Sequence, residues 1–169
     1  LTNNSSKSCL EFITQLQRLG ICAIANQLCT SPHLTIDFLK KELPSARRLF
    51  VLGTSGMGCE IEAAGFTLAE DDYRDEPDAV VVGFDTCLTF ARLCRAAYWI
   101  KNGKPFIASH EDRVCPTDQA TVLVDCGSVC AALTEATGRK PDAVLGKPNP
   151  RMLGEVLQRH ELRPENLAM

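Results

Sequence analysis

Five consecutive polar residues near the start of the sequence, Thr2 to Ser6 (TNNSS), have side chains that can bind an anionic group. They directly precede a segment whose apolar residues have helical spacing. The hydroxyl of Thr2, the amide of Asn3 and the positive end of the following helix would together suit a phosphate group. The alternative interpretation is a run of Ser and Asn that only caps the helix.

A lysine in the second half of the sequence, Lys147, offers another group that phosphate chemistry uses. It follows a predicted strand and lies in a turn between Gly146 and Pro148. A fixed ammonium group at the carboxyl end of a strand can hold a phosphoryl group and offset the charge of a nearby carboxylate. The alternative is a lysine exposed in a surface turn.

Three other motifs are weaker candidates for chemistry. The glycines of Gly53-x-x-Gly56-x-Gly58 follow a strand, but they do not have the G-x-G-x-x-G spacing of a dinucleotide-binding loop. Cys126 lies at the start of a predicted helix, which would lower the pKa of its thiol, but the sequence places no His partner for it. Asp85 ends a predicted strand, where a structural turn is the better interpretation.

Alternating strand and helix signals must position these side chains, and that alternation is typical of an α/β fold with a mainly parallel sheet. Residues 79–82 (AVVV) are the clearest strand, because they are β-branched and bounded by turn signals. Further strands are predicted at 49–52, 106–108 and 144–145, and helices at about 8–19, 31–43, 56–65, 89–102, 127–137 and 150–160. We therefore expect a three-layer α/β/α arrangement, with ligands at the carboxyl ends of the strands.

The composition excludes several classes of protein. With 45% hydrophobic and 23% charged residues, the 169-residue chain can bury an ordinary core. Its formal charge of -3 argues against a nucleic-acid partner, which would require clustered Lys and Arg. No apolar run is long enough to span a bilayer, so no membrane partner is expected. The acidic residues between 70 and 78 are interpreted as a solvated loop.

The nine cysteines indicate a reducing compartment rather than a disulfide framework or a zinc site. Their number is odd, and no Cys-x-x-Cys occurs. Because Cys59, Cys94 and Cys130 lie within largely apolar runs, we expect buried, reduced thiols. This pattern favours a cytoplasmic protein, and it predicts no disulfides and no structural zinc.

Seven segments, taken in order, resemble the NagD and para-nitrophenylphosphatase branch of the haloacid-dehalogenase-type (HAD) phosphatases. They are LTNNSS, TSPHLTIDFLKKELP, FVLGTSGMGCEIEAAGF, DAVVVGFD, GKPFIASHED, ATGRKPDAVLGKPNP and ENLAM. The resemblance covers essentially the whole chain, and GRKPDAVLGKPNPRML is its most specific part. It implies Mg²⁺-dependent hydrolysis of a small phosphorylated metabolite through an aspartyl-phosphate, beneath an α/β cap of the type called C2.

The resemblance also implies roles for the two phosphate-binding candidates. Thr2 matches the hydroxyl that holds a phosphate oxygen, and the Asn3 amide is expected to assist it. Lys147 matches the lysine that neutralises the nucleophile and the phosphoryl group. The resemblance therefore brings both ends of the sequence to one site.

Two segments of the cap match positions near the substrate. Residues 109–112 (SHED) fall where the family usually reads Thr-Asn-x-Asp, so His110 and Asp112 are expected near the leaving group, with His110 in place of Asn. Residues 125–128 (DCGS) match a helix start that faces the active site. There the amides of Gly127 and Ser128 would meet an anionic or polar substrate.

Two motifs of the family are absent from the sequence. The nucleophile motif Asp-x-Asp-Gly is expected before Leu1, and the acidic motif Gly-Asp-x-x-x-Thr-Asp is expected after Met169. We therefore expect the nucleophile and the Mg²⁺ ligands to lie outside this chain, which would begin at the end of one strand and finish at the start of another, Leu167–Met169. Because positioning residues alone cannot run phosphoryl transfer, the chain by itself is predicted to be inactive.

The resemblance predicts how the chain divides. Residues 22–142 are expected to form the cap, and residues 1–21 and 143–169 to form fragments of a Rossmann-like core, side by side because the cap is inserted between them. A homodimer through the cap is also expected. The alternative from another functional class is a non-catalytic cap or oligomerisation module, for this chain in isolation.

Overall fold

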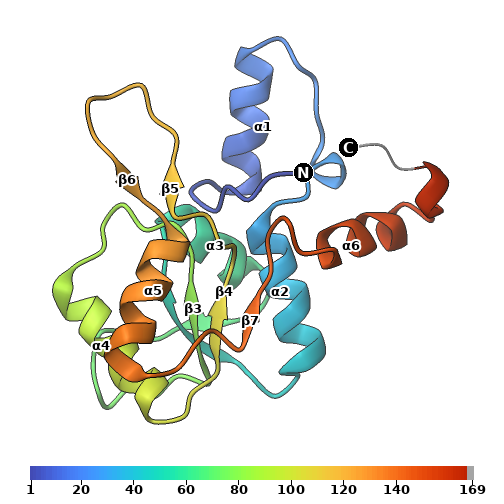
Figure 1. Cartoon of the computed structure of the whole chain (residues 1–169). Coiled ribbons are helices and arrows are strands. Elements are labelled where there is room, and N and C mark those ends of the chain that lie inside the picture. The colour runs from blue at the N-terminus through green and yellow to red at the C-terminus, as the bar shows by residue number, and fades with distance from the viewer. Residues whose placement is uncertain (167–169) are drawn as a thin grey trace.

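A five-stranded parallel sheet forms the centre of the computed structural model, which describes residues 1–166 (Figure 1). The strand order is β2-β1-β3-β4-β7, and every neighbouring pair is parallel. The strands are β1 (Arg48–Leu52), β2 (Thr67–Leu68), β3 (Ala79–Val82), β4 (Phe106–Ala108) and β7 (Ala143–Val144). The mainly parallel sheet predicted from the alternating strand and helix signals is confirmed.

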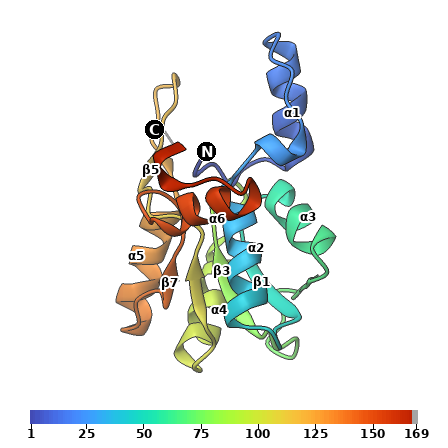
Figure 2. The ribbon, with the colours of Figure 1, turned by 90° about the vertical axis from the view of Figure 1, so that its right-hand side faces the viewer.

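Helices cover both faces of this sheet. The helices α2 (Ser31–Glu42) and α3 (Ser55–Ala63) pack on one face, and α4 (Phe90–Lys101) and α5 (Cys126–Thr137) pack on the other (Figures 1 and 2). Because side chains alternate along a strand, Leu49 and Val51 of β1 join the first core, and Phe50 and Leu52 join the second. Strands covered on both faces are largely apolar, as residues 49–52 of β1 and all four residues of β3 are.

The remaining elements lie at the edges of this unit. They are α1 (Cys9–Arg18), α6 (Arg151–Arg159), 3₁₀ turns at Ala25–Gln27 and Pro164–Asn166, and an antiparallel pair of strands, β5 (Val114–Cys115) and β6 (Leu123–Val124). Helix α1 stands away from the sheet and has no buried residue (Figure 1). No helix in the stretch 1–166 combines the length and the apolar character needed to cross a membrane.

Helix α1 is capped by a residue outside the TNNSS run. The Ser8 hydroxyl accepts a hydrogen bond from the Glu11 backbone N–H, and the Glu11 carboxylate accepts one from Ser8 N–H at 2.6 Å. This is a complete capping box. The capping interpretation of Thr2 to Ser6 is therefore wrong, because another residue already caps the helix.

The N-terminal segment is tied to the start of α2. Thr2 forms a parallel bridge with Thr30, in which Thr2 N–H donates to Cys29 O at 3.0 Å and Ser31 N–H donates to Thr2 O at 3.1 Å. At the other end of the chain, β7 pairs with β4, so the sheet continues one strand past residue 142. The division into a cap and core fragments stays a prediction, and its expected strand at Leu167–Met169 lies outside the described residues.

The expectation of buried thiols holds for three cysteines, Cys29, Cys126 and Cys130. It is wrong for Cys59 and Cys94, which are exposed. Both lie on helices that bury only the side facing the sheet, so an apolar neighbourhood in the sequence did not imply burial.

Candidate functional site

The sequence-predicted phosphate residues from both ends of the chain line one cavity. This cavity has a volume of about 610 Å³, and its lining includes Thr2, Asn3 and Lys147. Lys147 lies more than 140 residues after the other two in the sequence. The rest of the lining is contributed by Asn4, Ser5, Phe84, Glu111, Asp112, Cys115, Pro116 and Pro148. We refer to it as the Thr2–Lys147 cleft. The sheet positions it, because the loops after β3, β4 and β7 all reach it.

A close approach of the chain to itself at Gly146 brings these segments together. Gly146 N–H donates to Ser109 O at 2.8 Å, which extends the β4–β7 pairing. A Cβ on Gly146 would lie 2.5 Å from His110 Cβ and 2.6 Å from Asn3 Oδ1. Those separations are far inside van der Waals contact, so only glycine allows the Lys147 turn to reach Asn3 and His110.

The Thr2 side chain remains able to donate a hydrogen bond into the cleft. Its Oγ1 accepts a hydrogen bond from Asn4 N–H at 3.1 Å, which leaves the hydroxyl hydrogen without a partner among the described residues. Asn4 in turn accepts from Ser6 N–H at 2.8 Å and so closes the next turn. Half-buried Lys147 provides the cationic group of the cleft. A hydroxyl donor and an ammonium group facing one space can bind a phosphoryl group.

Asn3, by contrast, does not point a free amide into the cleft. Its Oδ1 accepts from Lys147 N–H at 2.6 Å, and its Nδ2 donates to Lys147 O and to Asp112 Oδ2, both at 3.0 Å. Asn3 is buried, with 8% of its surface exposed. Its side-chain amide is thus fully used within the protein.

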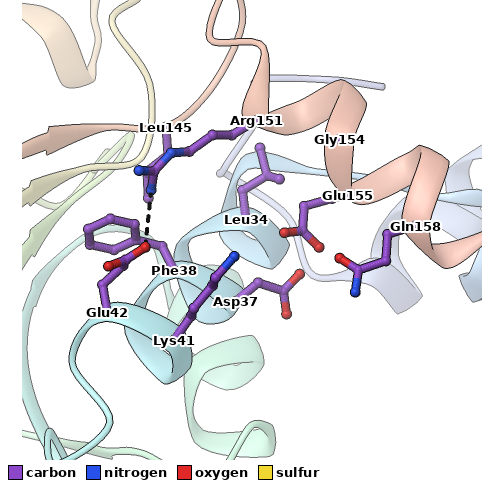
Figure 3. A pocket seen from close by; sticks show the side chains of 10 residues that line it. All are labelled: Leu34, Asp37, Phe38, Lys41, Glu42, Leu145, Arg151, Gly154, Glu155 and Gln158. Carbon is purple, nitrogen blue, oxygen red and sulfur yellow. Dashed lines mark ion pairs between the residues drawn. The ribbon is translucent and has the colours of Figure 1, made fainter. Parts of the chain in front are cut away.

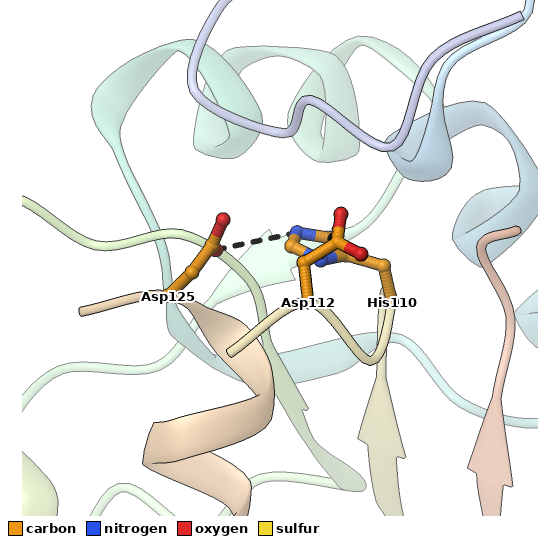
Figure 4. A group of neighbouring side chains, drawn as sticks. All are labelled: His110, Asp112 and Asp125. Atoms are coloured by element: carbon orange, nitrogen blue, oxygen red, sulfur yellow. Dashed lines mark ion pairs between the residues drawn. The ribbon is translucent and has the colours of Figure 1, made fainter. Parts of the chain in front are cut away.

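The imidazole of His110 lies between two carboxylates (Figure 4). Nδ1 lies 3.5 Å from Asp112 Oδ2, and Nε2 lies 3.5 Å from Asp125 Oδ1 and 3.3 Å from Ser5 Oγ. Ser5 Oγ accepts a hydrogen bond from Phe84 N–H at 2.8 Å, so its own hydrogen is free for Nε2. This favours a neutral imidazole with its proton on Nδ1, on the side of Asp112.

Burial governs the ionisation of this group. It lowers the pKa of His110, whose residue is 1% exposed, and the charges of Asp125 and Asp112 oppose that shift. Burial also raises the pKa of Asp125, against the hydrogen bond from Cys126 N–H and the charge of His110. Both directions favour the uncharged forms, because a low-dielectric interior disfavours each ion.

Within residues 1–166, His110, Asp112 and Asp125 form a group that could hold a metal ion, since one ligand atom from each lies within 4.8 Å of the others. A single ion, however, can bond to only one ring nitrogen. The two nitrogens of His110 face different carboxylates. The ring makes one hydrogen bond, between Nε2 and Ser5 Oγ at 3.3 Å, and its buried Nδ1 has no hydrogen-bond partner among the described residues.

Gly127 and Ser128 lie at a neighbouring cavity of about 940 Å³, which His110 and Glu111 also line. Their amides were expected to meet the substrate, but both are engaged within the fold. Gly127 N–H donates to Asp112 O at 2.8 Å, and Ser128 N–H donates to Asp125 O at 3.0 Å. The expectation of free amides does not hold, because the 112–113 loop folds back onto the start of α5.

Ser5 and Glu111 line the cleft, but sequence reasoning assigned neither of them a role of its own within its segment. Ser5 is fully buried and contacts both Phe84 N–H and His110. Its place in the TNNSS run could have indicated a role, but its partners lie 79 and 105 residues away. Cys126, weighed as a nucleophile, is fully buried, and its thiol donates to Val82 O at 3.1 Å, so it does not reach the cleft.

A third cavity, of about 300 Å³, lies between α2 and α6 (Figure 3). Its charged side chains offset one another: Arg151 lies 3.9 Å from Glu42 and also covers the Phe38 ring, and Lys41 lines the cavity with Asp37 and Glu155. No pairing of a nucleophile with a base occurs among these residues. This cavity is a packing feature of the two helices.

The sequence comparisons match this chain to phosphatases. A family model described as haloacid dehalogenase-like hydrolase matches residues 1–67. An acid sugar phosphatase of Staphylococcus saprophyticus is 32% identical over 169 residues, covering 100% of this chain and 63% of that protein. This chain therefore spans less than two thirds of that relative's length.

Solved structures share the fold over nearly the whole chain. A 4-nitrophenylphosphatase from Thermotoga maritima has a TM-score of 0.90 at 34% identity, covering 99% of this chain and 62% of that one. A glycerol phosphate phosphatase from Mycobacterium tuberculosis, in complex with magnesium, gives 0.87 at 33% identity, with 95% and 48% covered. NagD from Escherichia coli K-12 gives 0.81 at 27% identity, with 95% and 60% covered.

Proposed function

This chain belongs to the haloacid dehalogenase-like hydrolases of the NagD and 4-nitrophenylphosphatase type, and on that premise we propose that it serves in the Mg²⁺-dependent hydrolysis of a small phosphomonoester. In this proposal the chain supplies the substrate-covering cap, the phosphate-binding Thr2 and the catalytic Lys147. The aspartate nucleophile, which forms the aspartyl-phosphate, comes from outside these 169 residues. No Asp-x-Asp occurs within them.

The observation that carries the proposal is the shared lining of the Thr2–Lys147 cleft. Phosphoryl transfer requires its attacking and leaving groups to be held in line and the charge on the phosphoryl oxygens to be offset. Thr2 can donate its hydroxyl hydrogen to one such oxygen, and Lys147 can place a positive charge beside another. Together they orient the phosphoryl group and stabilise its charge, but they cannot attack it.

Magnesium would have to be held by groups other than those of this chain. Mg²⁺ requires six oxygen ligands in octahedral geometry, usually with one or two carboxylates. The Thr2–Lys147 cleft contains the ammonium of Lys147, which would repel a cation, and its carboxylates Glu111 and Asp112 both come from the loop after β4. The residues that line the cleft therefore do not fit a magnesium site.

The proposed substrate class rests on two carboxylates in the lining of the cleft, Glu111 and Asp112. The Asp112 side chain is 45% exposed, and its Oδ2 accepts a hydrogen bond from Asn3. Carboxylate oxygens accept hydrogen bonds from hydroxyl groups. We propose a small hydroxylated phosphate ester, in keeping with the sugar and glycerol phosphates named for two of the similar phosphatases.

The test compares two proteins, the 169-residue chain and a chain extended at both ends to the length of its relatives. Hydrolysis of para-nitrophenyl phosphate is measured with and without Mg²⁺. We expect Mg²⁺-dependent turnover from the extended chain only, because losing catalytic groups commonly costs on the order of 10⁴-fold or more in rate. Comparable rates from the two proteins would show that the missing nucleophile lies within residues 1–169, against the proposal.

A further inference from the structure

The side-chain amide of Asn3 pairs with both backbone groups of Lys147. Oδ1 accepts from Lys147 N–H at 2.6 Å, and Nδ2 donates to Lys147 O at 3.0 Å. In an antiparallel ladder, two opposed residues exchange the same two hydrogen bonds. The Asn3 side chain thus makes the two hydrogen bonds that a neighbouring strand would make to Lys147, which lies beyond the end of β7.

The orientation of this amide is fixed by its partners. Nδ2 faces two acceptors, Lys147 O and Asp112 Oδ2, whereas Oδ1 faces one donor, Lys147 N–H. Exchanging the oxygen and the nitrogen would place an NH₂ group against an N–H and an oxygen against two oxygens. The three hydrogen bonds therefore hold only in the orientation observed.

Among the described residues, the Asn3 side chain is the one hydrogen-bond partner of the Lys147 backbone. Its N–H and C=O have Asn3 as their partner, and the next residue, Pro148, has no N–H to donate. The preceding residue, Gly146, has no side chain, which is what allows Asn3 Oδ1 to approach within contact. The residues on either side are held by other hydrogen bonds, from Gly146 N–H to Ser109 O at 2.8 Å and from Asn149 N–H to Gly146 O at 2.9 Å, so Asn3 fixes the backbone groups of Lys147 itself.

Asn3 also connects this turn to the loop after β4. Its second Nδ2 hydrogen goes to Asp112 Oδ2, and that carboxylate lies beside His110 Nδ1. One buried amide therefore bonds both to the backbone of Lys147, which carries the cleft's cation, and to the Asp112 carboxylate. Loss of the amide would remove both sets of hydrogen bonds.

We infer that Asn3 is a positioning residue, which holds the backbone of Lys147 so that its ammonium meets the phosphoryl group, and that its side chain does not itself bind phosphate. This inference rests on the proposed function for the role of Lys147. The clamp between Asn3 and Lys147 is a separate, structural statement. The two can therefore be tested apart.

The catalytic role is tested by a double-mutant cycle in the extended protein, using Asn3→Ala, Lys147→Ala and the double variant. We expect Asn3→Ala to lower kcat/KM for para-nitrophenyl phosphate on the order of 10²-fold, as misplacement of a catalytic group does. In the Lys147→Ala background the same change should cost less than about threefold, because a residue that acts through Lys147 has nothing left to position. Losses that multiply would show that Asn3 acts on the substrate directly and would overturn the inference.

A near-isosteric variant covers the case in which Asn3→Ala does not fold. Asn3→Asp keeps an acceptor for Lys147 N–H but removes the hydrogens given to Lys147 O and Asp112. We expect Asn3→Asp to lower kcat/KM in the wild-type background. In the Lys147→Ala background it should cost no more than Asn3→Ala does there. The control is Asn102→Ala, which removes an amide-to-carbonyl hydrogen bond of 2.8 Å to Tyr98 O at the end of α4, far from the cleft; it should leave kcat/KM unchanged.

The clamp itself is tested without any activity, by amide hydrogen exchange of Lys147 in the 169-residue chain. We expect slow exchange of the Lys147 amide in the wild type and in Asn102→Ala, and faster exchange in Asn3→Ala. If Asn3→Ala does not fold, Asn3→Asp replaces it, and its exchange rates should change only in the Lys147 turn. An unprotected Lys147 amide in the wild type would overturn the inference whether or not the enzyme is active. Conversely, a protected amide in an extended protein without phosphatase activity would refute the proposed function and leave the clamp standing.

Discussion

The Asp85 carboxylate accepts a hydrogen bond from Arg92 Nη1 at 2.9 Å, and no part of the Asp85 side chain is exposed. Its other oxygen accepts from Cys87 N–H at 2.8 Å, and Arg92 Nη2 reaches Val51 O at 2.5 Å. The pair thus ties the chain after β3 to α4 and to β1. Asp85 stabilises the fold, and its burial keeps it from acting as a nucleophile.

Replacing Asp85 should therefore destabilise the protein. Asp85→Ala leaves the Arg92 guanidinium and the Cys87 amide without their partner, and we expect a loss of about 1–3 kcal/mol in the free energy of unfolding. Urea unfolding followed by circular dichroism measures it. The exposed Asp118, changed to Ala, is the matched control and should unfold as the wild type does. An unchanged urea midpoint for Asp85→Ala would contradict the structural role.

His110 should make the protein less stable in mild acid. Burial lowers the pKa of His110 in the folded protein below its ordinary value of 6.5. At a pH between the folded and the unfolded pKa, His110 is therefore protonated in the unfolded chain but not in the folded one. Unfolding then takes up a proton, and the stability contributed by neutral His110 falls as the pH falls through this window. Burial raises the pKa of Asp125, whose contribution has the opposite sign and grows as the pH falls.

The substitution His110→Asn separates the two contributions. It removes the acid-sensitive imidazole and, with it, the positive charge that a protonated His110 would carry and that would lower the pKa of Asp125. Both effects should reduce the stability lost between about pH 7.5 and about pH 5.5. Urea unfolding at the two pH values measures the loss, with His160→Asn at an exposed position as the control. An equal or larger loss in His110→Asn would show that His110 is not held neutral by the fold.

The cysteines should react in two classes. In the native 169-residue chain, a thiol reagent should label the exposed Cys22, Cys59, Cys87 and Cys94 rapidly, and the buried Cys29, Cys126 and Cys130 only on unfolding. After denaturation without a reductant, all nine should titrate as free thiols. Mass spectrometry of the labelled peptides assigns each site. Fewer than nine free thiols would contradict the expectation of a reducing compartment.

Thr2 should contribute through its hydroxyl alone. In the extended protein, Thr2→Val keeps the shape of the side chain and removes the donor, and we expect kcat/KM for para-nitrophenyl phosphate to fall about 10²-fold, as loss of one oxyanion donor does. Thr121→Val, at an exposed position, is the control. Steady-state kinetics decide, and an unchanged kcat/KM would remove Thr2 from the proposed site.

Much of the fold could be predicted from the sequence because the signals involved are local. The apolar, β-branched run at Ala79–Val82 and the apolar run ending at Leu52 each became a strand buried on both faces. The two-residue strands β2, β5 and β6 were missed, since two residues are too few to show a period. Burial of Cys59 and Cys94 was predicted wrongly for a related reason: composition does not say which side of a helix faces the sheet.

For the candidate site too, the sequence indicated some features and only the tertiary structure decided others. Residue types and turn positions alone singled out Thr2, Asn3 and Lys147, because a hydroxyl, an amide and an ammonium group after strand ends are suited to phosphate wherever they occur. Only the tertiary structure decided what each one touches. The Asn3 amide holds the Lys147 backbone rather than a ligand, and Ser5 reaches His110. Those partners lie more than 100 residues apart, and pairing over such separations is set by how the sheet brings strand ends together, which no local pattern in the sequence records.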